Sequence, residues 1–120
     1  RLIEIVRNHS IKYCYIGSET QRVKMCQDDI IYIQKAKGTK YTSFFTVKGE
    51  VRERISIENV LEKLMSDEFV IVDRSSVVNL RHIMKVRDNV IYLSNGDAVE
   101  ASHARIKKVK ENIRKYWEER

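Results

Sequence analysis

The sequence predicts a mostly β single domain that contains two helices, near residues 57–66 and 103–117. Three observations lead to this fold class. Short runs rich in β-branched and aromatic residues recur along the chain, turn signals separate them, and only two segments carry apolar residues at helical spacing. A chain of 120 residues is long enough to bury one modest core, so we expect one domain.

The first half of the chain contains three predicted strands. DIIYIQ (29–34) and YTSFFTV (41–47) are separated by the basic stretch KAKGTK, and Lys48-Gly49 marks a tight turn into EVRERISI (50–57). Residues 1–27 leave two alternatives open. LIEIV, KYCYI and RVKMC have the composition of strands, whereas residues 1–8 also fit the end of an interdomain helix.

Turn residues organise the second half. HIMKVR (82–87) and VIYLS (90–94) flank the two-residue connection Asp88-Asn89. Asn95-Gly96 is the strongest turn signal in the chain, and we expect a type I′ turn because both of its central residues need positive φ. This turn is predicted to join VIYLS to DAVEA (97–101) as a hairpin.

Each predicted helix has a serine before its apolar stripe. Ser56 can cap the first helix, in which the apolar residues are Val60, Leu61, Leu64 and Met65. Ser102 can cap the second, whose stripe consists of Ile106, Val109, Ile113 and either Tyr116 or Trp117. Lysines and arginines occupy the opposite face of the second helix, where Lys107, Lys108 and Lys110 are expected to be a solvated surface.

Positive charge is clustered along the chain. The net charge is +6 and the pI is about 9.4. Residues 30–54 and 101–116 are strongly basic, and the acidic stretch 55–70 lies between them. Clustered lysines and arginines favour a polyanionic partner such as nucleic acid.

Several classes of protein are not expected. No apolar run approaches the roughly 18 residues of a membrane span, and no signal peptide opens the chain, so we expect no membrane partner. Cys14 and Cys26 are too few for a disulfide framework, which favours free thiols in a reducing cytoplasm and leaves a Cys14–Cys26 redox switch as an alternative. The chain starts at Arg1 rather than Met, so our hypothesis is that it is a piece of a longer protein.

Catalysis, metals and cofactors are not expected either. His9, His82 and His103 lack metal-ligand spacing, and His82 is expected at the surface on a strand edge. Gly38 stands alone without a phosphate-binding motif, and Asp28-Asp29 fits a turn before the strand at 29–34. Because Ser75 and Ser76 have no identifiable His–Asp partners, we do not predict an enzyme.

The order of these elements resembles the LytTR-type DNA-binding domain, the effector module often attached to bacterial response regulators. The likeness covers about residues 20–113, and its most specific parts are DRSSVVNLRHI (73–83), the Asn95-Gly96 hairpin and ASHARIKKV (101–109). We therefore assign residues 1–19 to an N-terminal strand or interdomain linker, and residues 20–120 to the LytTR-like domain.

The resemblance implies a β fold of small stacked sheets that binds double-stranded DNA through loops entering consecutive major grooves. It also implies a role in transcription regulation within a two-component system, an upstream receiver domain and a homodimer on paired DNA sites. Carried over to this sequence, three regions would face DNA: the loop 37–41, the turn 74–75 and the junction 102–105. The predicted DNA-binding residues are Lys37, Lys40, Tyr41, Arg74, Ser75, Ser102, His103 and Arg105.

The turn DRSS has two interpretations. In the first, Arg74 contacts a guanine edge or a phosphate, Ser75 donates to phosphate, Val77 and Val78 anchor the turn in the core, and Asn79 satisfies backbone groups. In the second, Asp73 and Arg74 form a local ion pair in an ordinary surface turn. Tyr41 likewise fits either DNA contact or packing at the start of a strand.

The sequence also departs from the family pattern. The family usually places a basic residue and then His at the positions of Ile71 and Asp73, and often a basic residue at the position of Ala104. These departures motivate the alternative function, a protein-interaction or dimerisation module of the same fold that has lost DNA recognition. RNA binding is a weaker alternative, because few aromatic residues lie beside basic ones in the predicted loops.

Overall fold

The computed structural model describes residues 11–119, in which ten strands, two α-helices and two short 3₁₀ helices follow one another. The open alternatives for residues 1–8 lie outside the described residues. In chain order the elements are β1 (Tyr13–Gly17), β2 (Arg22–Cys26), η1 (Gln27–Asp29), β3 (Ile30–Lys35), β4 (Thr42–Thr46), β5 (Gly49–Glu53), α2 (Ile57–Leu64), β6 (Phe69–Asp73), β7 (Ser76–Asn79), η2 (Leu80–His82), β8 (Ile83–Arg87), β9 (Val90–Leu93), β10 (Ala98–Glu100) and α3 (Ile106–Glu118).

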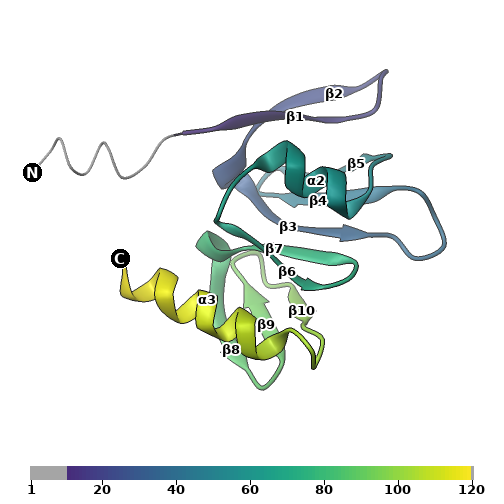
Figure 1. Ribbon diagram of the computed structural model, residues 1–120. Helices are drawn as coiled ribbons and strands as arrows, with labels where there is room; N and C mark the ends of the chain where they lie inside the picture. Colours follow the sequence, from purple (N-terminus) through teal and green to yellow (C-terminus); the bar gives the residue numbers. More distant parts are fainter. Residues whose placement is uncertain (1–10, 120) are drawn as a thin grey trace, which may run out of the picture.

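The strands pair into three antiparallel sheets (Figure 1). The largest has the strand order β5-β4-β3-β7-β6, the second is β10-β9-β8, and β1 and β2 form a two-stranded sheet. The predicted fold class, a mostly β domain of small antiparallel sheets with two helices, is therefore confirmed. The strand predicted at 50–57 is too long, because β5 ends at Glu53 and α2 already begins at Ile57.

The five-stranded sheet is the middle layer, and its strands β3 and β7 are buried on both faces. Ile33 pairs with Val77, and both side chains face the cluster that contains α2. Tyr32 pairs with Val78, and these side chains face the cluster that contains α3 and the three-stranded sheet. Because neighbouring residues of a strand point to opposite faces, a strand covered on both sides has a continuous apolar sequence.

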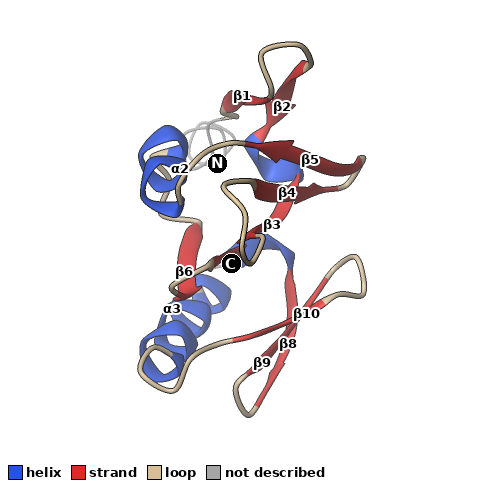
Figure 2. Ribbon diagram, turned by 90° about the vertical axis from the view of Figure 1, so that its right-hand side faces the viewer, coloured by secondary structure: helices blue, strands red, loops and turns tan. Residues whose placement is uncertain are grey.

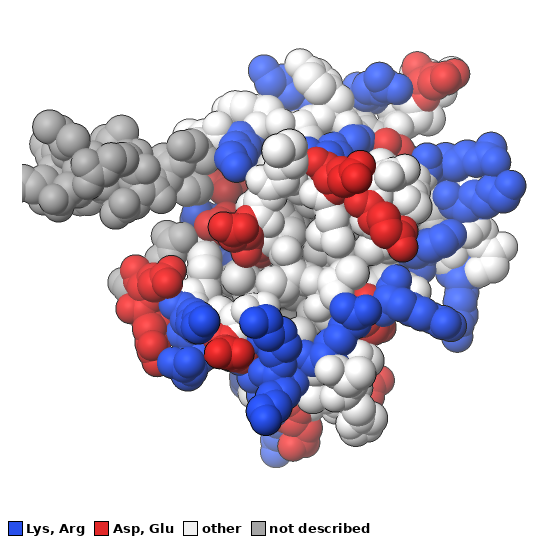
Figure 3. Space-filling view, in the orientation of Figure 1, with Lys and Arg blue, Asp and Glu red and all other residues white. Residues whose placement is uncertain are grey.

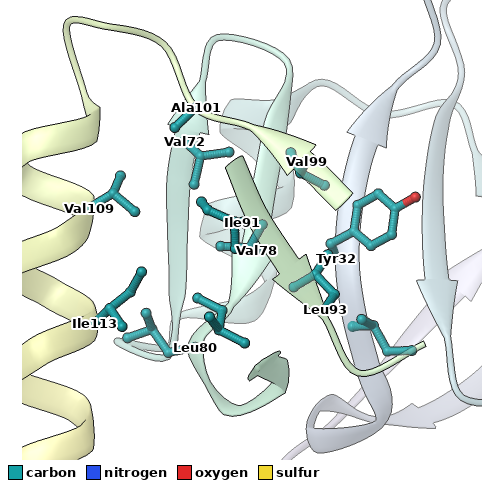
Figure 4. Packing of buried hydrophobic residues seen from close by; sticks show 12 residues of the cluster. Tyr32, Val72, Val78, Leu80, Ile91, Leu93, Val99, Ala101, Val109 and Ile113 are labelled. Carbon is teal, nitrogen blue, oxygen red and sulfur yellow. The ribbon is translucent and has the colours of Figure 1, made fainter. Parts of the chain in front are cut away.

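Helix α3 closes one of these two cores. Val109 and Ile113 point from the helix toward Val72 and Ile91 of the sheets and Leu80 of η2 (Figure 4). All five side chains are buried. The predicted apolar stripe of α3 is thus confirmed.

Tyr116, not Trp117, continues the stripe at the end of α3. Tyr116 packs at the edge of the core, whereas the side chain of Trp117 is 48% exposed.

Helix α2 and the β1–β2 sheet cover the other core. The predicted cap of α2 is confirmed, because Ser56 Oγ accepts a 3.1 Å hydrogen bond from the backbone N–H of Asn59. Lys63 on α2 donates to the carbonyl oxygen of Tyr15 at 2.8 Å and to the carboxylate of Glu53 at 2.9 Å. Glu53 also accepts from the backbone N–H of Gly17, so these bonds hold the β1–β2 sheet to β5 and α2.

The two cysteines lie on neighbouring strands, but their side chains face opposite sides of the β1–β2 sheet. Cys14 pairs with Met25, whereas Cys26 pairs with Tyr13, one position further along the register. Both thiols are free. Burial raises the pKa of Cys14, which lowers the thiolate fraction on which its reactivity depends. The register therefore gives no support to the redox switch that the sequence left open.

The hairpin between β9 and β10 is confirmed, but its predicted type I′ turn is wrong. Gly96 has a φ of +90°, whereas Asn95 is not among the residues with positive φ in the described chain. The backbone N–H of Gly96 donates to Leu93, and Asn95 Oδ1 accepts from the backbone N–H of Asp97 at 3.0 Å. The side chain of Asn95 therefore closes the turn without a left-handed backbone at its own position.

The prediction of a surface His82 on a strand edge is also wrong. His82 ends η2 and is half-buried, with Nε2 2.6 Å from the carbonyl oxygen of Asp28 and Nδ1 2.7 Å from Ser94 Oγ. Because a carbonyl oxygen only accepts, these partners place the proton on Nε2. His82 thus joins η1 to the end of β9 as a structural residue.

Candidate nucleic-acid interface

Three connections meet at one end of the five-stranded sheet: the loop between β3 and β4, the turn between β6 and β7, and the junction between β10 and α3 (Figures 1 and 2). Two backbone hydrogen bonds join them. The N–H of Lys35 donates to the carbonyl oxygen of Ser75 at 2.9 Å, and the N–H of Ser102 donates to that of Val72 at 2.9 Å. The three predicted DNA-facing regions are therefore neighbours in space although they are far apart in sequence.

A basic hollow of about 700 Å³ lies between these connections. Four cationic side chains line it against one carboxylate, so its charge is strongly positive at neutral pH. Serine hydroxyls from the turn and the junction provide further donors. The lining residues are Gln34, Lys35, Ala36, Lys37, Asp73, Arg74, Ser75, Ser76, Ser102 and Arg105.

The β6–β7 turn is shaped by the carboxylate of Asp73. Asp73 Oδ1 accepts a 2.7 Å hydrogen bond from the backbone N–H of Ser75, as in an Asx turn. Within residues 11–119 no ion pair joins Asp73 to Arg74, so the ion pair expected in the second interpretation of the turn is wrong. Asp73 is used inside the turn, and the exposed side chain of Arg74 remains available to a ligand.

The residues after the turn hold it in place as predicted. Val77 and Val78 are fully buried, one on each face of the sheet. Asn79 is also fully buried; its Nδ2 donates to the carbonyl oxygen of Ile30 at 2.8 Å, and its Oδ1 accepts from the backbone N–H of Arg81 at 3.0 Å. The expectation that Asn79 satisfies backbone groups is confirmed.

The β3–β4 loop is ordered by its own hydrogen bonds. Lys35 Nζ donates to the carbonyl oxygen of Thr39 at 2.7 Å, and Thr39 Oγ1 donates to that of Ala36 and accepts from the N–H of Tyr41. Gly38 supplies the left-handed backbone that this loop needs, with a φ of +75°. Lys37 and Lys40 are both exposed, but only Lys37 lines the basic hollow.

Tyr41 lies apart from the basic hollow. It is 47% exposed and lines a second hollow, which also includes residues of the β1–β2 connection and of β5. Beside it, Glu50 accepts hydrogen bonds from Ser43 Oγ and Arg52 Nε, and these bonds lower the pKa of the Glu50 carboxyl.

The junction before α3 differs from the prediction. Ser102 does not cap the helix, because α3 begins at Ile106 with Arg105 as its N-cap, and no side chain caps it. Instead, the carbonyl oxygen of Ser102 accepts from the N–H groups of Arg105 and Ile106, which inserts an extra turn. Ser102 and Arg105 consequently line the hollow, whereas His103 is exposed and lies outside its lining.

Sequence reasoning missed three polar lining residues at strand ends. Gln34, Lys35 and Ser76 sit at the ends of β3 and β7, immediately beside the loops that were selected. Gln34 Nε2 donates to Ser76 Oγ at 2.9 Å across the paired strands. Their position at strand ends next to a basic loop is the signal that would have found them.

The surface charge follows the same arrangement. Lys and Arg side chains gather along the edge of the molecule beside the β3–β4 loop, on the right-hand side of Figure 3.

Within the described residues, no group of three His, Cys, Asp or Glu side chains could hold a metal ion. None of the helices in this part of the chain is long and apolar enough to cross a membrane.

Comparison with known proteins identifies the family. The family model described as the LytTr DNA-binding domain matches residues 20–114, which include the three connections around the basic hollow. The chain therefore belongs to the LytTr DNA-binding domain family, which confirms the resemblance.

One solved structure supports the same fold. It is the LytTr DNA-binding domain of a protein designated a methyl-accepting/DNA response regulator from Bacillus cereus, with a TM-score of 0.72 and 17% sequence identity. The match covers 84% of this chain and 95% of that one. The comparison with curated proteins found no match.

Proposed function

We propose that this chain is the sequence-specific DNA-binding module of a bacterial transcriptional regulator, and that its three clustered connections enter the major groove of a duplex. The observation that carries this proposal is the basic hollow, in which Lys37, Arg74 and Arg105 come from three different connections of the fold. Membership of the LytTr DNA-binding domain family identifies DNA as the anionic partner in this proposal.

The side chains divide into two roles by position. Arg74 is exposed at the tip of a rigid turn, so its guanidinium can donate two hydrogen bonds to a guanine edge. His103 and Arg105 lie on the junction, where they extend base recognition or grip phosphate. Lys37 and Lys40, on the β3–β4 loop, neutralise phosphates and position the protein without reading the sequence.

Ser75 and Ser102 donate hydroxyl hydrogen bonds to phosphate oxygens in this proposal. Both residues line the basic hollow beside cationic side chains. Tyr41 is the exception among the predicted contacts, because it borders a different hollow, and we assign it to the margin of the DNA surface.

The internal hydrogen bond of Asp73 argues against the interaction-module alternative. Asp73 motivated that alternative because a negative charge would repel DNA. The carboxylate accepts a backbone N–H inside the turn, which offsets part of its charge where the duplex would approach. In the complete regulator, two copies on paired sites and an upstream receiver domain would complete the mechanism in the bacterial cytoplasm.

Selection from a random duplex pool, followed by sequencing, tests this function. The proposal predicts enrichment of a motif, and gel shifts with that motif should be far stronger than with a scrambled duplex. If about six phosphates are contacted, the slope of log affinity against log salt should be about −5. Absence of enrichment together with absence of binding at low salt would contradict the proposal.

A further inference from the structure

A third concave surface lies toward the C-terminal end of α3, between the last turns of the helix and strand β8. This groove has a volume of about 470 Å³. Val86, Ile113 and Trp117 supply its apolar lining, and Lys110, Arg114 and Glu118 complete it. We call it the α3–β8 groove. Trp117 is an unusual residue to leave 48% exposed, because its large ring gains most from burial.

The helix face beside the groove is basic. Lys107, Lys110 and Arg114 follow one another at i, i+3 and i+7, so they form a single stripe that runs along α3 toward Trp117. Arg114 pairs with Glu118 at 3.1 Å, whereas Lys107 and Lys110 take part in no ion pair within residues 11–119. An occupant with acidic side chains along this stripe would complement it.

The groove and the basic hollow lie at opposite ends of α3. Arg105 lines the hollow, and Trp117 lines the groove twelve residues later, which is about 18 Å along a helix. Figure 1 shows the C-terminal end of α3 pointing away from the β3–β4 loop. A duplex seated on the hollow would therefore leave the α3–β8 groove open.

We propose that the α3–β8 groove binds an acidic amphipathic segment of another protein. Apolar side chains of this segment would pack on Val86 and Trp117, and its carboxylates would pair with Lys107 and Lys110. The apolar lining favours a protein over nucleic acid, because the sugar–phosphate backbone has little to bury against it. This inference does not depend on the proposed DNA-binding function.

The chain carries its own reporter for a test, since Trp117 is its single tryptophan. The probe is a synthetic peptide with Leu at i, i+3, i+4 and i+7 and Glu at the flanking positions. Added to the full chain, it should shift Trp117 emission to the blue and saturate, and the same peptide with Lys in place of Glu should bind much more weakly. No emission change, or equal binding of the two peptides, would overturn the proposal.

Two matched variants locate the contact. Lys110→Glu should weaken binding of the acidic peptide by on the order of tenfold. Lys108→Glu makes the same charge change on another face of α3 and should leave the affinity within about twofold. Equal losses for the two variants would show a non-specific charge effect and contradict the assigned groove.

Two further results would also overturn the proposal. Displacement of the peptide by a short duplex would assign the groove to the DNA surface. A change of Trp117 emission with protein concentration alone would assign it to a second copy of the chain. Trp117→Ser, followed by calorimetry with the same peptide, provides an independent readout and should abolish most of the binding.

Discussion

The backbone N–H of Lys35 donates a 2.9 Å hydrogen bond to the carbonyl oxygen of Ser75, and this bond ties the end of β3 to the β6–β7 turn. The two residues are forty positions apart in sequence, yet both line the basic hollow. The two strands that the turn connects, β6 and β7, are themselves part of the five-stranded sheet, so the sheet also fixes the position of the turn. The proposed contact surface is therefore attached to a rigid layer and needs little ordering when it meets a duplex.

Arg74 and Lys40 should give different defects when mutated. Arg74→Ala is expected to lower the preference for the selected duplex over a scrambled one by about 1–3 kcal/mol, because a base contact is lost. Lys40→Ala should weaken binding to both duplexes equally and reduce the salt slope by about 1. Gel shifts at several salt concentrations measure both quantities, and an identical effect of the two variants would refute the division of roles.

Asn79 should be essential for stability. Asn79→Ala removes two hydrogen bonds at a fully buried position and leaves the carbonyl oxygen of Ile30 and the N–H of Arg81 without this partner. We expect the free energy of unfolding to fall by about 2–3 kcal/mol, measured by urea denaturation. Asn95→Ala, in an exposed turn, serves as the control and should cost less than about 1 kcal/mol.

Glu50 should make stability depend on pH. Hydrogen bonds from Ser43 and Arg52 lower the pKa of its carboxyl, so the ionised form is favoured in the folded state. The resulting stabilisation is present above the ordinary carboxyl pKa of 4.5 and is lost as the pH falls through the lowered value.

This effect is measured by comparing the melting temperature of the wild type with that of Glu50→Gln at several pH values. The wild type should melt at a higher temperature than the variant at neutral pH, and the gap should close in acid. Because Glu50 is 38% exposed, added salt should shrink the gap as well. A gap that stays constant across the pH range would rule out this linkage.

The two thiols should differ in reactivity. Cys14 is 6% exposed, and burial raises its pKa, so little thiolate is available to an alkylating reagent. Cys26 is only half-buried and should be labelled first in the native protein. Mass spectrometry after mild alkylation checks the order, and Cys14 should react fully only after unfolding. Preferential native labelling of Cys14 would contradict its placement in the core.

Local patterns predicted most elements, because the signal for each lies within a few neighbouring residues. The strand composition of DIIYIQ and the apolar spacing around Val109 are examples. The prediction of a cap at Ser56 was correct for the same reason, since its partner, Asn59, is three residues away. The predicted cap at Ser102 is wrong although the residue has a similar sequence position, because an extra turn separates Ser102 from α3, which begins only at Ile106.

Contacts between residues far apart in the sequence could not be predicted from local sequence patterns. Three features depend on contacts that no single sequence window contains. They are the pairing of β3 with β7, the hydrogen bonds of His82 to Asp28 and Ser94, and the hollow between three distant connections. The selected site residues came from the family resemblance, and the structure brings together Lys37, Arg74, Ser75, Ser102 and Arg105. Lys40, Tyr41 and His103 lie outside the hollow, and for all eight residues contact with DNA stays a prediction.

An NMR titration of the ¹⁵N-labelled chain with a selected duplex tests the central claim most directly. The account predicts that the largest amide shifts fall together on the β3–β4 loop, the β6–β7 turn and the junction before α3, with Lys37, Arg74 and Arg105 among them. Amides at the C-terminal end of α3 should move little. Shifts confined to one connection, or centred on the β1–β2 sheet, would contradict a single DNA surface built from three parts of the chain.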